Sequence, residues 1–398
     1  MGEAKSFDIS KLAVWDAYIR VKRNDGGAGV DAVSLEMFEE DLENNLYKIW
    51  NRMSSGSYFP PPARTVLIPK SGGTRTLGIP TVADRIAQMT VKLYLEPELE
   101  PVFDEDSYGY RPGKSALDAL NATRSRCWQF DWVLDLDIKG FFDNVRHHIL
   151  LDKVAERVND AQIMRLLKLI LKVGGKKGVP QGGVISPLLS NIYLNEVDKM
   201  LERAKEVTRN GRYTYIEYSR FADDLVILVD GFSKWNWLVD AANKRLLEEL
   251  EKLDVQLNRE KSKLVDLTRG ETFSFLGFDF RRAKTRRGKL GVLVTPRMKA
   301  RTALLSRLKE VFRRFRSQPL DRIVAEINPI LRGWVNYFRI GNSSQCFGYV
   351  KDWVERKIRR HLMRARKRSG FGWNRWSRAW LYKTFGLFNN YKVIRYQA

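Results

Sequence analysis

Two apolar runs are joined by a tight acidic pair in the stretch Tyr218-Ser219-Arg220-Phe221-Ala222-Asp223-Asp224-Leu225-Val226-Ile227-Leu228-Val229. The flanks, 213–218 and 225–229, are rich in β-branched and aromatic residues, which suit strands. The stretch therefore predicts a β-hairpin with Asp223 and Asp224 at its tip. Neighbouring carboxylates that lose water repel each other, so they are stable there chiefly with a cation between them. A hard divalent cation such as Mg²⁺ would serve, but an isolated Asp-Asp pair is more often a solvated turn.

A second acidic strand is needed before the pair indicates a metal site, and residues 132–138 supply it. This run alternates apolar and acidic residues, so Val133, Asp135 and Asp137 share one face of a strand. Asp137 would emerge at the strand end toward Asp223 and Asp224. Three carboxylates converging on two Mg²⁺ ions form the site that clamps the attacking and leaving oxygens in a phosphoryl transfer.

The two acidic elements together resemble the palm of a reverse transcriptase, and four further motifs point to one branch of that family. Residues 68–80 and 177–194 resemble nucleotide-binding segments of group II intron reverse transcriptase/maturases. Residues 273–278 resemble their primer-grip hairpin, and residues 331–338 resemble the maturase thumb. The motifs occur in the family's order and cover almost the whole chain. One departure is Phe221, where the family often has tyrosine, and this change leaves the metal-binding aspartates in place.

The resemblance implies an α+β right-hand polymerase with fingers, a ferredoxin-like palm and an α-helical thumb, the maturase X domain. On this basis we assign residues 1–130 to the fingers, 131–294 to the palm and 295–398 to the thumb. Part of 150–180 would belong to the fingers.

The implied catalytic and metal-binding residues are Asp137, Asp223 and Asp224, and the backbone carbonyl of Ile138 would be a further metal ligand. Two Mg²⁺ ions are the expected cofactors, with Mn²⁺ as a substitute. The implied nucleotide-binding residues are Lys70, Arg75, Phe142, Gln181, Gly182 and Lys261.

Five of these six residues have a plainer alternative role. Lys70 and Arg75 would fold over the triphosphate, but they would also fit a surface hairpin with incidental charges. Phe142 stands where related polymerases place a ring under the ribose, which would exclude a 2′-hydroxyl, yet it would also fit a core position. Gln181 and Gly182 would approach the nucleotide, or they would form an ordinary strand-to-helix loop.

The remaining implied contacts involve primer, template and bound RNA. The primer grip would comprise Phe275, Leu276 and Gly277. Nucleic-acid contacts are expected from Arg111, Lys114, Arg332, Arg339, Arg356, Arg359 and Arg360, although some thumb cations would form only a solvated face.

Composition agrees with a polyanionic partner. Seventy Lys and Arg residues oppose 47 Asp and Glu residues, which gives a formal net charge of +23. Nucleic acid fits better than a membrane because no apolar run approaches the length of a bilayer span. Two cysteines suit a reducing bacterial cytoplasm, where we expect the protein to lie.

Periodicity predicts helices at both ends of the chain. Residues 10–22 predict an amphipathic helix capped by Ser10, with Leu12, Trp15, Tyr18 and Ile19 on its apolar face. From Pro296 onward, helices are predicted over 296–316, 320–338 and 344–368.

The function implied is RNA-directed DNA synthesis by extension of a primer with dNTPs on an RNA template. Binding of a parent group II intron RNA, splicing and retrohoming into target DNA would accompany it. A host-adopted relative in DNA repair or phage defence is a second reading, and a splicing-only RNA-binding maturase is a third. The intact acidic triad argues against the third. A His-Asn-His endonuclease pattern is not found, so nicking of target DNA by this chain is not expected.

Overall fold

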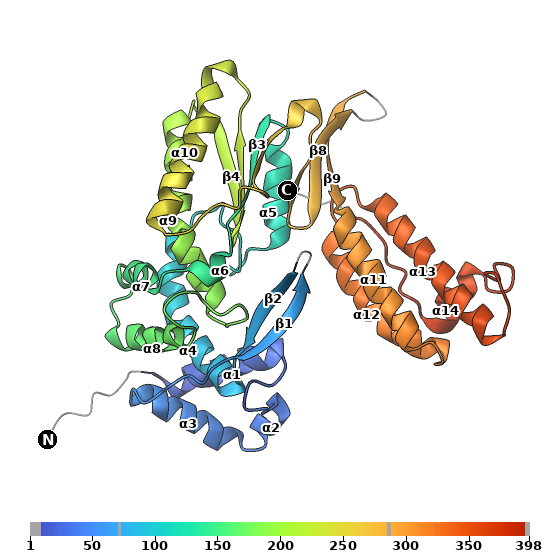
Figure 1. The fold of residues 1–398 in the computed structure, drawn as a ribbon, viewed down its shortest axis with the longest axis horizontal. Helices are drawn as coiled ribbons and strands as arrows, with labels where there is room; N and C mark the ends of the chain where they lie inside the picture. The colour runs from blue at the N-terminus through green and yellow to red at the C-terminus, as the bar shows by residue number, and fades with distance from the viewer. Residues whose placement is uncertain (1–8, 71–72, 285–287, 395–398) are drawn as a thin grey trace. The chain divides into compact units, whose positions relative to one another are not determined.

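The computed structural model describes residues 9–70, 73–284 and 288–394, with residues 69 and 70 described by their backbone alone. The chain divides into two compact units (Figure 1). The first comprises residues 1–119 and 136–263, and the second comprises 120–135 and 264–398. None of the described helices is both long and apolar enough to cross a membrane.

The first unit begins with helices and one hairpin. Ser10 caps the first helix by accepting a hydrogen bond from the Ala13 N–H at 3.0 Å, as predicted. Strands β1 and β2 pair antiparallel, with Ile68 opposite Arg75. The elements are α1 (Lys11–Asn24), α2 (Leu35–Glu39), α3 (Leu42–Ser54), β1 (Arg64–Lys70), β2 (Gly73–Ile79), α4 (Val82–Leu99) and α5 (Ala116–Arg126), of which α5 continues into the second unit.

The predicted apolar face of α1 was right at Tyr18, which is buried, but wrong at Leu12 and Trp15. Leu12 is 74% exposed and Trp15 is 46% exposed. The helix instead packs on α3 and α4 through a stripe at i, i+3, i+4 and i+7, which is the spacing that keeps side chains on one helical face. The buried residues are Val14, Ala17, Tyr18 and Val21.

A four-stranded sheet with strand order β4-β5-β3-β6 carries the predicted acidic residues. Helix α9 precedes β4, and α10 connects β5 to β6, so the order of elements is that of a ferredoxin-like β-α-β-β-α-β unit. The predicted ferredoxin-like palm is therefore confirmed. The elements are β3 (Trp132–Asp137), α9 (Ser186–Thr208), β4 (Ile216–Phe221), β5 (Asp224–Val229), α10 (Asn236–Lys252) and β6 (Lys263–Asp266).

Three helices lie between β3 and α9 in the chain. The short α6 directly follows β3, and α8 is strongly amphipathic, with one face of leucine and isoleucine buried. Pro187 stands in the first turn of α9, where its missing N–H costs nothing. The helices are α6 (Phe141–Asn144), α7 (His147–Ala155) and α8 (Ala161–Lys172).

The second unit combines a three-stranded antiparallel sheet with a helical bundle. The helices begin and end close to the predicted bounds, and they enclose a core in which Ile327, Leu331 and Ile358 have no exposed surface. The elements are β7 (Phe273–Phe275), β8 (Phe278–Lys284), β9 (Leu290–Pro296), α11 (Met298–Arg314), α12 (Leu320–Phe338), α13 (Ser344–Ala365) and α14 (Arg378–Phe385).

Candidate active site

The acidic pair lies at the turn of the β4–β5 hairpin, where the sequence predicted it. Phe221 pairs with Asp224, so Ala222 and Asp223 form the connection. Leu225 and the four residues after it are buried, which anchors the hairpin in the core. Asp223 is half-buried and Asp224 is exposed. The acidic groups therefore stand at the surface end of a well-buried hairpin.

Asp137 ends β3, the strand beside β5 in the sheet. Neighbouring strands of a ferredoxin-like sheet run antiparallel. The last residue of β3 and the first residue of β5 therefore lie at the same end of the sheet. The Asp137 N–H donates to Ser262 Oγ at 3.2 Å, and Lys261 Nζ lies 3.1 Å from Asp137 Oδ2. Lys261, a predicted nucleotide-binding residue, thus contacts Asp137, a predicted metal ligand. Ile138, the residue after Asp137, forms an antiparallel bridge with Leu257.

The donor chemistry suits a hard cation, because the predicted ligands are three carboxylates and one backbone carbonyl, all of them oxygen donors. Within the described residues, however, no group of three or more His, Cys, Asp or Glu side chains is arranged to hold a metal ion. The Asp137 carboxylate instead forms an ion pair with the Lys261 ammonium through one of its oxygens. Metal binding by the triad stays a prediction.

The β1–β2 hairpin and the loop before α9 bring three predicted nucleotide-binding residues together. Arg75 Nε donates to Gln181 Oε1, and the Gly78 N–H donates to the Gln181 carbonyl at 2.8 Å. Gly182 has φ of +107°, and a Cβ there would lie 2.6 Å from the Gly78 carbonyl oxygen. Glycine is therefore required both by backbone conformation and by close approach. The Lys70 side chain lies outside the described part of the structure.

Phe142 lies on α6, and its backbone contacts the loop before α9. Its carbonyl accepts from the Val179 N–H at 2.7 Å, and a Cβ on Gly178 would meet that carbonyl oxygen at 3.2 Å. The Phe142 ring is half-buried and meets the Phe141 ring edge to face, with 5.4 Å between centroids. The backbone of Phe142 therefore contacts the loop two residues before Gln181.

Tyr110 was not among the predicted site residues, although Arg111 and Lys114 in the same loop were. Its ring packs on the Phe221 ring at 5.4 Å, and the residue is 54% exposed. Burial raises the pKa of the Tyr110 hydroxyl, the charge of Asp223 raises it further, and Arg75 acts in the opposite direction. Arg75 and Asp223 are therefore both close enough to Tyr110 for their charges to affect its hydroxyl.

Arg111 was predicted to contact nucleic acid, and this prediction is corrected. Its side chain is 7% exposed and pairs with Glu100 at 2.8 Å. It also donates to the carbonyls of Ser107 at 2.8 Å and Phe103 at 3.2 Å. The guanidinium is committed to closing its own loop. Lys114 remains half-exposed, with Nζ 5.1 Å from the centre of the Tyr108 ring.

The predicted primer grip is the turn between β7 and β8. Phe275 is 3% exposed, so its side chain supports the hairpin and cannot contact a primer. Leu276 and Gly277 both have positive φ, and Tyr337 Oη donates to the Leu276 carbonyl at 2.8 Å. Contact with a primer at this hairpin would therefore fall to the Leu276–Gly277 turn.

The thumb prediction is corrected at Arg359, which is 1% exposed. Its guanidinium pairs with the buried Glu355 and lies 4.2 Å from the Trp373 ring centre, so it belongs to the core. Arg332, Arg356 and Arg360 are exposed and Arg339 is half-buried.

Helices α11 and α13 border a cavity of about 630 Å³ whose lining is dominated by cations. Burial lowers the pKa of Lys357 there, and the nearby positive charge of Arg360 lowers it further. Such crowding of positive charge favours an anionic partner. The lining cations are Lys309, Arg313, Arg316, Lys357, Arg360 and Arg364.

Two solved telomerase structures resemble the fold only distantly. Apo telomerase from Candida tropicalis superposes with a TM-score of 0.43 at 15% identity, covering 62% of this chain and 52% of that one. Telomerase from Candida albicans gives a TM-score of 0.44 at 12% identity, covering 83% and 63%.

Sequence relatives are closer. Protein YkfC of Escherichia coli is 36% identical over 327 residues, which cover 71% of this chain and 84% of that protein. The group II intron-encoded protein LtrA of Lactococcus lactis is 32% identical over 239 residues, covering 55% of this chain and 40% of that protein. This chain thus matches well under half the length of the latter relative.

Two family models match along the chain in succession. The reverse transcriptase (RNA-dependent DNA polymerase) model matches residues 68–280, a span that contains both acidic elements and the Arg75–Gln181 contact. The group II intron maturase-specific domain matches residues 301–380, which form the helical bundle. The chain therefore belongs to the reverse transcriptases, the RNA-directed DNA polymerases, and within them to the group II intron reverse transcriptase/maturase family.

Proposed function

We propose that this protein copies RNA into DNA by extending a primer with dNTPs, with Asp137, Asp223 and Asp224 holding two Mg²⁺ ions. The observation that carries the proposal is the acidic turn between β4 and β5, beside the end of β3 in a ferredoxin-like sheet. When bound, the two ions would lower the pKa of the primer 3′-hydroxyl and would neutralise charge on the phosphates. The carbonyl of Ile138 would complete the ligand set.

The residues around the turn fit the steps that the reaction requires. Arg75 would offer a forked guanidinium to the triphosphate, and its hydrogen bond to Gln181 ties it to the loop before α9. Lys261, which lies beside Asp137, would offset charge on the departing pyrophosphate. Lys70 and Gly182 would complete the nucleotide site, and the Leu276–Gly277 turn would hold the primer.

A maturase role is the second part of the proposal. The match of residues 301–380 to the maturase-specific domain and the net charge of +23 support binding of a structured intron RNA, splicing and retrohoming into target DNA. We place the fingers at 1–130, the palm at 131–294 and the thumb at 295–398. Exposed thumb cations would contact RNA phosphates and make binding sensitive to salt.

The test is to sequence the RNA that copurifies with the full chain and then to extend a primer on that RNA with dNTPs and Mg²⁺. A single structured intron RNA together with DNA synthesis is the expected result. Synthesis without a specific RNA would support a host-adopted polymerase and would overturn the maturase role. A specific RNA without any synthesis would point to a splicing-only maturase and would overturn the polymerase.

Phe142→Ala is expected to relax sugar selection. Removing the half-buried ring opens space beneath the ribose, so discrimination against ribonucleotides should fall by about 10- to 100-fold in kcat/KM. The measurement compares incorporation of dNTP and rNTP opposite the same template base. Phe142→Tyr is the matched control, because it keeps the ring and should keep the discrimination. Unchanged sugar selection in Phe142→Ala would remove the gate role.

A further inference from the structure

Arg220, three residues before Asp223, is buried with 0% exposure. A buried guanidinium requires partners for its charge and its hydrogens. Nε donates to Asp198 Oδ1 at 2.7 Å, and Nη2 pairs with the other oxygen of the same carboxylate. Asp198 lies on α9 and is also fully buried. A two-pronged contact of this kind fixes the plane of the guanidinium.

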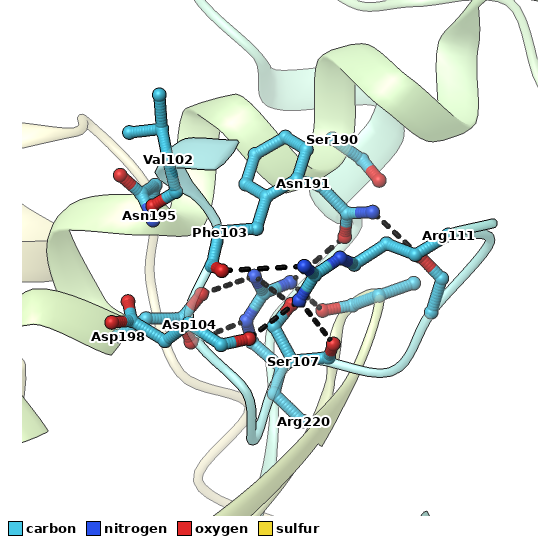
Figure 2. Close-up of polar contacts among 12 residues, drawn as sticks. Val102, Phe103, Asp104, Ser107, Arg111, Ser190, Asn191, Asn195, Asp198 and Arg220 are labelled. Carbon is cyan, nitrogen blue, oxygen red and sulfur yellow. Dashed lines mark hydrogen bonds and ion pairs between the residues drawn. The ribbon is translucent and has the colours of Figure 1, made fainter. Parts of the chain in front are cut away.

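The remaining donors of Arg220 reach two further parts of the first unit (Figure 2). Nη2 donates to Ser107 Oγ at 2.7 Å, in the loop before α5. Nη1 donates to Asn191 Oδ1 at 3.1 Å and to the Ala222 carbonyl at 3.0 Å. One side chain therefore connects α9, the 103–111 loop and the acidic turn.

Ala222 needs such a contact because its backbone is strained. Its φ is +55°, in the left-handed region that residues with a Cβ rarely adopt. Conformations of this kind persist where the surroundings hold them, and they gather at functional sites. The Ala222 carbonyl belongs to the peptide group that leads into Asp223. Fixing that carbonyl fixes the direction in which the next residue leaves the turn.

The 103–111 loop also binds β4, the strand that contains Arg220, along the side that faces away from β5. The Arg220 N–H donates to the Asp106 carbonyl at 3.0 Å, and the Tyr108 N–H donates to the Arg220 carbonyl at 2.8 Å. Asn191, already bound to Arg220, also donates to the Gly109 carbonyl at 2.6 Å. The loop thus acts as an added edge segment beside β4, with Arg220 at its centre.

We infer that Arg220, oriented by Asp198, is a positioning residue for DNA synthesis that holds the Ala222 carbonyl and thereby aims the Asp223 carboxylate. The inference rests on the proposed function, in which Asp223 is a metal ligand. Arg220 is fully buried, so it acts only through the turn. Lysine at this position would keep the charge but could not reach Asp198, Ser107 and Ala222 together, since its donors are confined to one nitrogen.

The test uses Arg220→Lys and Asp198→Asn in the full chain. Backbone hydrogen exchange over residues 218–229, without nucleic acid or metal, reports the order of the turn. Faster exchange confined to this segment is expected in both variants. The single-turnover rate of dNTP addition should fall by about 100-fold, the effect of misplacing a reacting group by about an ångström, while primer-template affinity stays unchanged.

Arg282→Lys is the matched control for loss of a buried arginine. Arg282 pairs with Asp131 and donates to the Cys127 carbonyl at 2.6 Å and the Phe130 carbonyl at 2.8 Å, in the second unit. This variant should lower the Tm without faster exchange at 218–229.

Two results would overturn the inference. One is an Arg220→Lys variant whose hydrogen exchange over residues 218–229 and whose rate of dNTP addition both equal those of the unchanged protein. The other is faster exchange throughout the chain with a rate loss no larger than the unfolded fraction explains, which would make the role merely structural. Asp198→Asn nearly preserves shape and decides the question if Arg220→Lys fails to fold. If the unchanged protein makes no DNA, the proposed function fails, whereas the exchange result still decides whether Arg220 orders the turn.

Discussion

Asp223→Ala is expected to abolish nucleotide incorporation while leaving RNA binding close to that of the unchanged protein. The carboxylate is half-buried at the hairpin turn, and in the proposed mechanism it holds the cations that neutralise charge in the transition state. Such stabilisation is worth several kcal/mol, so the rate should fall by at least about 1,000-fold. Primer extension on an RNA template measures the rate, and a filter-binding assay measures RNA affinity.

Folding and charge are controlled separately in this experiment. Asp240→Ala removes an exposed carboxylate from α10, so it changes the net charge equally and should leave synthesis intact. The Tm of Asp223→Ala should not fall, because removing one of two adjacent carboxylates relieves repulsion. DNA synthesis by Asp223→Ala at more than a few per cent of the normal rate would refute the catalytic assignment.

Gly109→Ala is expected to reduce DNA synthesis by about 100-fold, because the turn must move to admit a methyl group. A Cβ on Gly109 would lie 2.3 Å from the Ala222 nitrogen and 3.1 Å from the Phe221 carbonyl carbon. Both atoms are backbone, so no flexible side chain can yield. The cost of such overpacking is about 1–3 kcal/mol, too little to unfold the chain but sufficient to displace the turn.

Gly174→Ala is the matched control in the same unit. Its Cβ would lie 3.6 Å from the nearest atom, an ordinary van der Waals contact, so neither rate nor Tm should change appreciably. Single-turnover kinetics and thermal unfolding together separate the two cases. A Gly109→Ala variant that polymerises at the normal rate would show that the 103–111 loop can move away without disturbing the aspartates.

Much of the site was predictable because its elements are short and local. The hairpin at 218–229 follows from two β-rich runs around an acidic pair, and β3 follows from alternation over 132–138. The resemblance to group II intron reverse transcriptase/maturases predicted the ferredoxin-like palm and the helical thumb. The Arg75–Gln181 contact joins residues 106 apart, and only the family resemblance suggested that they act together.

The errors concern which side of an element faces the core. Leu12 and Trp15 are as apolar as the residues that α1 buries, so composition could not choose between two faces of the helix. Arg111 and Arg359 were assigned to nucleic acid because they are basic and lie in motif-like segments. Both are instead enclosed with acidic partners, and Arg111 and Glu100 are eleven residues apart.

The sequence by itself determined the strands, the acidic turn and the positive charge, because these depend on residue type and short-range periodicity. Only the tertiary structure decided which cations remain exposed and which residues brace the turn. Arg220 binds Asp198, 22 residues away, and Ser107, 113 residues away. Burial and pairing of a charge depend on segments brought together by folding, and no local pattern in the chain specifies them.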